Sequence, residues 1–534
     1  MTIHAYPVLS AATVREKLLA RNEIALIDVR EEDPYAQEHP LWASNFPLSR
    51  LELQAWRRIP RRDTTIVVYG EDELEDLAPR AAQILSGLGY TRVFILEGGL
   101  EGWRAAGGEI FRDVNVPSKS FGEWVEHHKD TPSLSAEEVK KRLESDTDTI
   151  VLDARRFDEY QTMNIPGSIS VPGAELVLRA RALAPNPSTP IIVNCAGRTR
   201  SIIGTQSLVN AGLPNPIAAL RNGTIGWTLA GYELETGANR KFPDNIDRQA
   251  LELAQADARR VADAAGVRHI TIDSLPQLQE KGRTTYLIDV RTPEEYKNGH
   301  LAGFINVPGG QLVQETDHTA PVRGARIVLA DLDGVRANMS ASWLAQMGWE
   351  TFVIEPADPE DFTVKGETSN PAPEPGKTQE ISASQLQEIL NADENENYLI
   401  FDFTTSVNYL KRHIPGARFA LRSHIGRLVA AQPADKKFIF TCGSSQLARF
   451  AANDAQAHTS SPIFVLNGGT QAWIDAGLPL EHGPSHLASP AIDRYRRPYE
   501  GTDAPASAMQ AYLDWEFGLV EQLNRDGTHF FNVL

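Results

Sequence analysis

IIVNCAGRTRS, residues 191–201, joins a short apolar strand to a helix through a loop that begins at Cys195. Apolar residues spaced for a helix follow the loop, namely Ile202, Ile203, Leu208 and Val209. Another apolar strand, Val151-Leu152, ends in Asp153, which lies 42 residues before the cysteine. Short strands that alternate with helices are typical of an α/β layer structure with a parallel sheet.

The same plan occurs four times along the chain. The aspartates that end the first strand are Asp28, Asp153, Asp289 and Asp402. The residues that follow the second strand are Gly70, Cys195, Asp331 and Cys442, and they lie 42, 42, 42 and 40 residues after those aspartates. Internal repeats with a nearly fixed spacing indicate tandem copies of one structural plan.

A third landmark closes three of the copies. Trp103, Trp227 and Trp473 lie 33, 32 and 31 residues after Gly70, Cys195 and Cys442, and each follows a Gly-Gly or Asn-Gly pair. The third copy has only Val353-Ile354-Glu355 and then Phe362 at this place, so its last part is degenerate.

The repeats predict four α/β domains, each a parallel sheet flanked by helices, and a short helical C-terminal tail. Their predicted limits are residues 5–112, 130–240, 267–365, 378–483 and, for the tail, 484–534. Between them, Phe111–Pro132 is expected to be a polar linker, Asp247–Ala265 a connecting helix and Gly366–Lys377 an extended linker. A helical stretch is predicted at Met509–Leu523.

Composition narrows the classes of function. The 534 residues include only 2 cysteines, which excludes a disulfide scaffold and a Cys-rich zinc module. The formal net charge of −18 disfavours binding to nucleic acid or to anionic membranes. No apolar run approaches the roughly 18 residues of a membrane span, and the N-terminal residues do not have the pattern of a signal peptide. The sequence therefore predicts a cytoplasmic protein with no membrane, nucleic-acid, metal or cofactor partner.

Cys195 is the candidate nucleophile. Successive backbone N–H groups of a loop between a strand and a helix can bind an anion, and the N-terminus of the helix adds positive potential. Gly197 permits the tight curvature, and Arg198 and Arg200 supply cations. We expect these groups to depress the pKa of Cys195 and to favour attack by its thiolate on an anionic substrate.

These features together resemble the rhodanese-like sulfurtransferase family. The resemblance covers about residues 5–483 as four tandem domains, and its most specific motif is CAGRTRS in the second. It implies sulfane-sulfur transfer from a small anionic donor such as thiosulfate to a thiol or cyanide, through a persulfide on Cys195. The loop that would bind the donor consists of Ala196, Gly197, Arg198, Thr199, Arg200 and Ser201. By the same match, Asp153 and Arg155 are expected to be a structural pair.

The other copies depart from this motif. Gly70 and Asp331 replace the cysteine in domains one and three, so neither can hold a persulfide. Domain four keeps Cys442, but Leu447 stands where domain two has Arg200. Cys442 is therefore a possible second catalytic cysteine, with a thiol pKa expected to be less depressed than that of Cys195.

Two other functions remain as alternatives. A Cys-dependent phosphatase or arsenate reductase needs five residues between cysteine and arginine, but Ser201 occupies that place and Arg200 comes one residue earlier. A non-catalytic or regulatory scaffold of several rhodanese-like domains agrees with the two copies that lack the cysteine. The identity of the donor and acceptor and the oligomeric state are open at this level.

Overall fold

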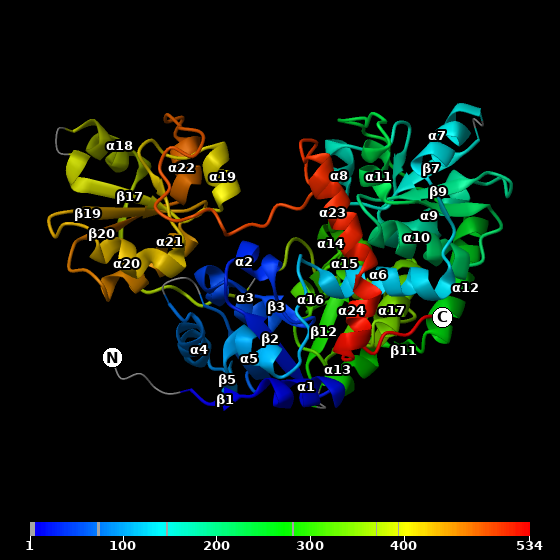
Figure 1. Ribbon diagram of the computed structural model, residues 1–534, viewed down its shortest axis with the longest axis horizontal. Coiled ribbons are helices and arrows are strands. Elements are labelled where there is room, and N and C mark those ends of the chain that lie inside the picture. Colours follow the sequence, from blue (N-terminus) through cyan, green and yellow to red (C-terminus); the bar gives the residue numbers. More distant parts are fainter. Residues whose placement is uncertain (1–5, 72–74, 146–147, 280–281, 370, 393–394) are drawn as a thin grey trace.

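The computed structural model describes all residues except 1–5, 72–74, 146–147, 280–281, 370 and 393–394. Residue 5, at which the first predicted domain starts, therefore lies outside the described residues. The described part contains four parallel sheets of five strands each, all with the same strand order (Figure 1). This confirms the predicted α/β class and its four copies.

Each sheet places the two diagnostic strands next to each other at its centre. The strand that ends in the aspartate and the strand that ends at the cysteine position are paired in parallel, as in Asp153↔Asn194. Apolar side chains fill both faces of these central strands, as expected for a parallel sheet covered by helices on both sides.

The strands, in sheet order, are as follows: in domain one β1 (Val8–Leu9), β5 (Val93–Leu96), β4 (Thr65–Tyr69), β2 (Ile24–Asp28) and β3 (Ala43–Asn45); in domain two β6 (Ser133–Leu134), β10 (Ile217–Leu220), β9 (Ile191–Asn194), β7 (Ile150–Asp153) and β8 (Ile169–Ser170); in domain three β11 (Arg268–Ile270), β15 (Glu350–Ile354), β14 (Arg326–Ala330), β12 (Thr285–Asp289) and β13 (Ile305–Asn306); in domain four β16 (Gln379–Ile381), β20 (Ile463–Leu466), β19 (Lys437–Thr441), β17 (Tyr398–Asp402) and β18 (Arg418–Phe419).

The helices that cover these sheets are, in domain one, α1 (Ala11–Leu19), α2 (Glu32–Gln37), α3 (Leu51–Arg58), α4 (Ala78–Gly87) and α5 (Gly99–Ala105); in domain two, α7 (Ala136–Ser145), α8 (Phe157–Thr162), α9 (Leu176–Leu183), α10 (Thr199–Asn210) and α11 (Gly223–Leu229); in domain three, α13 (Leu275–Gln279), α14 (Pro293–Asn298), α15 (Gly309–Gln314), α16 (Thr316–Thr319) and α17 (Arg336–Gln346); in domain four, α18 (Ala383–Asn391), α19 (Ser406–Lys411), α20 (Ile425–Ala430), α21 (Gln446–Gln456) and α22 (Gly469–Asp475). Domain three has only a 3₁₀ turn, Pro359–Asp361, where the others have a last helix, as its degenerate sequence predicted.

The connections differ from the prediction in two places. Residues 111–132 are not simply a polar linker, because they contain helix α6 (Val116–Lys129), whose side chains from Val116 to Glu123 are buried. The tail forms two helices, α23 (Ala506–Phe517) and α24 (Leu519–Asp526), rather than one. The helix predicted between domains two and three is present as α12 (Arg248–Ala264).

The tail leaves domain four and crosses to domain two (Figure 1). In the figure, the orange and red chain runs from the yellow fourth domain to the side of the teal second domain, where α23 lies near α8 and α11. Helix α24 then packs against α6. A contact between the last residues of the chain and the second domain was not foreseen from the sequence.

No helix among the described residues is long and apolar enough to cross a membrane.

Candidate active site

Cys195 lies directly after β9, at the carboxyl end of the domain-two sheet, and its side chain is buried. Ligand sites in open α/β sheets lie at this edge. The thiol donates a hydrogen bond to Oγ of Ser201, 3.4 Å away, and Ser201 in turn donates to the carbonyl of Arg198. The loop therefore holds the sulfur next to the first turn of α10.

A close approach of α11 shapes the loop. The carbonyl oxygens of Cys195 and Ala196 accept hydrogen bonds from the N–H groups of Thr224 and Ile225, at 2.9 and 3.0 Å. Gly223, which has a φ of +56°, makes this approach possible, because a Cβ atom there would lie 2.3 Å from the carbonyl oxygen of Cys195. The Asn-Gly landmark of the sequence thus has a physical reason in the packing of α11 on the cysteine loop.

The pKa of Cys195 differs from our expectation. Burial raises the pKa of the thiol, although Arg200 and the hydrogen bonds with Ser201 act in the opposite direction. The prediction of a depressed pKa was wrong, because the fold buries the thiol and removes it from water. The cost of desolvating a thiolate outweighs the attraction of one guanidinium at this position.

Arg200 and Arg198 are both engaged by glutamates. Arg200 makes a bidentate ion pair with Glu159 of α8, at 2.7 and 2.9 Å. Burial raises the pKa of Glu159, but the charge and hydrogen bonds of Arg200 act in the opposite direction, and the pKa is lowered to about 2. Arg198 binds Glu123 and Glu126 of α6 instead. Arg200 is the cation that lowers the pKa of Cys195, against the larger effect of burial.

The strand-end aspartates pair with the arginine two residues later in three domains. Asp28–Arg30, Asp153–Arg155 and Asp289–Arg291 form buried bidentate pairs, and each arginine also donates to a backbone carbonyl eight residues further on. The expected structural role of this pair is in agreement with these contacts. Domain four has Thr404 at the place of the arginine, so Asp402 has no such partner.

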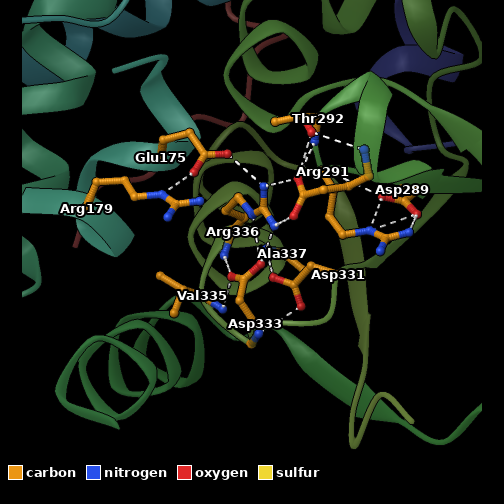
Figure 2. A network of polar contacts seen from close by, with 12 residues as sticks. Glu175, Arg179, Asp289, Arg291, Thr292, Asp331, Asp333, Val335, Arg336 and Ala337 are labelled. Atoms are coloured by element: carbon orange, nitrogen blue, oxygen red, sulfur yellow. Dashed lines mark hydrogen bonds and ion pairs between the residues drawn. The ribbon is translucent and has the colours of Figure 1, made fainter. Parts of the chain in front are cut away.

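Domain three fills its loop with its own carboxylate (Figure 2). Asp331, at the cysteine position, accepts hydrogen bonds from the N–H groups of Gly334 and Ala337, at 3.0 and 2.7 Å. Arg336, the counterpart of Arg200, binds Glu295, Glu175 and Asp333. The amide groups of Gly334 and Ala337 already donate to Asp331, so the loop has little capacity left to bind an external anion.

Cys442 has a more open loop. Gly443, Ser444 and Gln446 are exposed, whereas Ala196, Arg198 and Thr199 around Cys195 are buried. Burial raises the pKa of Cys442 as well; the backbone N–H groups of Ala448 and Ser444 oppose this rise, and Asp402 adds to it. The two cysteines therefore lie in loops of the same origin with different covers and different charges.

Sequence reasoning missed the cover over Cys195. Ala196 and Ile225 pack in one apolar cluster with Tyr499, Tyr512 and Leu513 of the tail. A polar cavity of about 430 Å³ between domain two and the tail is lined by Arg200, Glu159, Arg497 and Tyr499, among others. The high density of aromatic residues in the tail is the signal that could have indicated such a contact.

No cluster of three or more potential metal-ligating side chains occurs in the part of the chain that the structure describes.

This fold and site define a class of multidomain α/β proteins that have a cysteine at the carboxyl end of a central strand. The rhodanese-like domain family matches residues 10–106, 135–230, 271–355 and 382–476, and the chain belongs to this family.

Among solved structures, the chain resembles a thiosulfate sulfurtransferase from Pseudomonas aeruginosa, with 60% sequence identity and a TM-score of 0.96. That match covers 99% of this chain and 100% of the other. The putative sulfur carrier protein YrkF of Bacillus subtilis is 29% identical over 123 residues, which are 23% of this chain and 64% of that protein, so the chain spans less than two thirds of its length. The uncharacterised protein YqhL of the same organism is 31% identical over 108 residues, 20% of this chain and 80% of that protein.

Proposed function

We propose that the protein is a sulfurtransferase that moves sulfane sulfur from thiosulfate, or a similar small anion, to a thiol or cyanide. The observation that supports this most strongly is the position of Cys195 and its CAGRTRS loop within a chain that is 60% identical, over 99% of its length, to a thiosulfate sulfurtransferase. Domain limits at residues 5–112, 130–240, 267–365 and 378–483 and a cytoplasmic location are part of the same proposal. The two unpaired cysteines agree with a reducing compartment.

The reaction runs through a persulfide on Cys195. After the thiol has lost its proton to solvent, the thiolate attacks the outer sulfur of thiosulfate, the sulfur–sulfur bond of the donor breaks, and sulfite leaves with the bonding electron pair. A thiolate or cyanide then attacks the outer sulfur of the persulfide and releases the Cys195 thiolate. Both steps keep a negative charge at the loop, where backbone N–H groups and Arg200 stabilise it.

Within the loop, we assign Arg200 rather than Arg198 to the donor. Arg198 is held between two glutamates of α6, while Arg200 lines the polar cavity beside the site. Ala196, Gly197, Thr199 and Ser201 contribute backbone groups and the Ser201 hydroxyl. Cys442 remains a possible second catalytic cysteine, whose loop has no arginine at the position of Leu447.

Intact-mass spectrometry after treatment with thiosulfate tests the proposal. We expect wild-type protein to gain a sulfur atom on Cys195, and the Cys195→Ser variant to gain none at that position and to lose most sulfur transfer to cyanide. The Cys442→Ser variant reports whether the fourth domain contributes. A wild-type chain that gains no sulfur would support the scaffold alternative and contradict the proposal.

A further inference from the structure

The C-terminal tail brings an acidic side chain to the Cys195 loop. A Cβ atom on Gly197 would lie 3.1 Å from Cε1 of Tyr512 and 3.3 Å from Oε2 of Glu516, both on α23. Both of these side chains are buried. Three hundred residues of chain separate the loop from the helix, so this approach is a property of the folded molecule alone.

The acid is specific to domain two. At Ser444, the matching position in domain four, the residue is exposed, and a Cβ atom on the neighbouring Gly443 would meet no atom of the described residues within 4 Å. The two cysteine loops have the same origin in the repeat, yet among the described residues only the loop of Cys195 has a carboxyl group of the tail against it. A general feature of the fold therefore does not explain the presence of Glu516.

Glu516 has one partner and one oxygen to spare. The hydroxyl of Tyr512 donates to Oε1 at 2.8 Å, while Oε2 is buried and has no hydrogen-bond partner among the described residues. A buried acceptor without a partner is costly, but a neutral carboxyl can use this oxygen as an O–H donor.

The charged groups around Glu516 form ion pairs with other residues. Lys119 of α6 is bound by Asp113 at 2.7 Å, and Arg198 of the loop is bound by Glu123 of α6. Burial and the neighbouring Glu123 raise the pKa of Glu516 to about 8, although Lys119, Tyr512 and Arg198 oppose this rise. Glu516 also contributes to the raised pKa of Cys195, so the two groups influence each other electrostatically.

We propose that Glu516 is a specificity-determining residue of the Cys195 site, whose neutral carboxyl donates a hydrogen bond from Oε2 to an oxygen of the anionic sulfur donor. When the carboxyl loses its proton, Glu516 can no longer donate this hydrogen bond, and its negative charge faces the anion. The site then rejects the anionic sulfur donor. The role in donor binding rests on the proposed function, whereas the control of anion access to Cys195 does not.

Competitive alkylation measures this control without any sulfur transfer. In a full-length Cys442→Ser background, the rates of alkylation of Cys195 by iodoacetate, an anion, and by iodoacetamide, a neutral reagent, are compared from pH 6.5 to 9.5. Their ratio cancels the thiolate fraction, because both reagents need the same thiolate. We expect the ratio to fall about three- to tenfold as the pH rises through 8, since a new negative charge then repels iodoacetate.

The Glu516→Gln variant should show a ratio that does not depend on pH. Asp514→Asn, which removes an exposed carboxylate from the same helix, is the matched control and should behave as the wild type. Tyr512→Phe should move the fall to higher pH, because it removes a hydrogen bond that stabilises the ionised carboxylate. It also serves as a second variant if Glu516→Gln does not fold.

The proposal is overturned if Glu516→Gln or Tyr512→Phe keeps the wild-type fall, if the wild-type ratio is constant with pH, or if Cys195 is closed to both reagents. Failure of the proposed function would give a different result: the ratio of the two alkylation rates would fall with pH as expected, but the protein would gain no sulfur from thiosulfate.

Discussion

Arg200 places a positive charge near Cys195, and its ion pair with Glu159 holds the guanidinium in position. Its pair with Glu159 occurs again in domain three as Arg336 and Glu295, with the same separation of 41 residues. In domain four both members are absent, because Leu447 and Asn408 occupy the two positions. The glutamate thus holds the guanidinium in place wherever an arginine is present.

Replacement of Arg200 by alanine is expected to raise the KM for thiosulfate by roughly 10- to 100-fold, since a charge-assisted hydrogen bond contributes about 1.5–3 kcal/mol. The pKa of Cys195 should rise further, because Arg200 now lowers it. Steady-state kinetics and the pH dependence of alkylation check both effects. Arg142→Ala, an exposed change on α7, is the control, and unchanged kinetics in Arg200→Ala would remove Arg200 from the site.

Asp402 is a buried carboxyl beside Cys442 without the arginine that its counterparts have. Burial raises its pKa to about 6, although the N–H of Thr404 and the hydroxyl of Thr470 oppose this rise. We expect Asp402→Asn in a Cys195→Ser background to lower the pKa of Cys442, because a negative charge is removed. The pH at half-maximal alkylation measures this, and Asp435→Asn, in an exposed turn of the same domain, should leave it unchanged.

At the scale of elements, the approach of α11 to the cysteine loop depends on Gly223. Gly223→Ala should disorder the loop, because its Cβ atom would overlap the carbonyl of Cys195, and should cost more than about 2 kcal/mol of stability. Gly231→Ala is the matched control, since its φ is also positive but no atom lies within 4 Å of its Cβ position. It should cost only about 1 kcal/mol from backbone strain. Similar losses in thermal unfolding for both variants would contradict this account.

Helix α23 should respond to pH through Glu516. Its folded pKa of about 8 lies above the ordinary value of 4.5, so its contribution to stability is fully present below about pH 4.5 and is lost as the pH rises through 8. Relative to Glu516→Gln, the wild-type helix should lose up to about 1.4 kcal/mol per pH unit in this window. Hydrogen exchange of the α23 amides at pH 5, 6, 7 and 8 measures this loss, and a constant difference from the variant would refute it.

At the scale of the whole molecule, domain four is attached to domain one through a buried ion pair. Arg422 donates two hydrogen bonds to Glu52 of domain one, at 2.6 and 2.7 Å, and two to Asp454 of its own domain, at 2.8 and 3.3 Å. The same contact region includes Ser49 and Ser423. Since the tail starts in domain four and ends against domain two, this attachment also fixes where the tail begins.

Glu52→Ala should loosen domain four, because it leaves a buried guanidinium with half of its partners, at a cost of about 2 kcal/mol or more. We expect faster proteolytic cleavage within 366–377, the segment that precedes domain four, and a larger radius of gyration in solution scattering. Glu388→Ala, an exposed change on α18, provides the reference. If both variants are cleaved at the wild-type rate, the pair does not hold the domains together.

The sequence alone determined the local features of this protein. Strand, loop and helix follow one another in each copy because apolar periodicity and glycine positions are local properties, and the repeated spacing then showed four copies of one α/β plan. The same local pattern indicated Cys195, and the absence of a cysteine at Gly70 and Asp331. The family resemblance also implied the structural pair of Asp153 and Arg155, which are two positions apart in the chain.

Only the tertiary structure decided the environment of the cysteine. Burial turned the expected lowering of the Cys195 pKa into a rise, and two glutamates of α6 bind Arg198. The carboxylate of Asp331 was found to satisfy the amides of its own loop. Desolvation and ion pairing depend on which groups meet in space, so no local sequence pattern could specify either effect. Glu516, for example, lies about three hundred residues from the loop that it contacts.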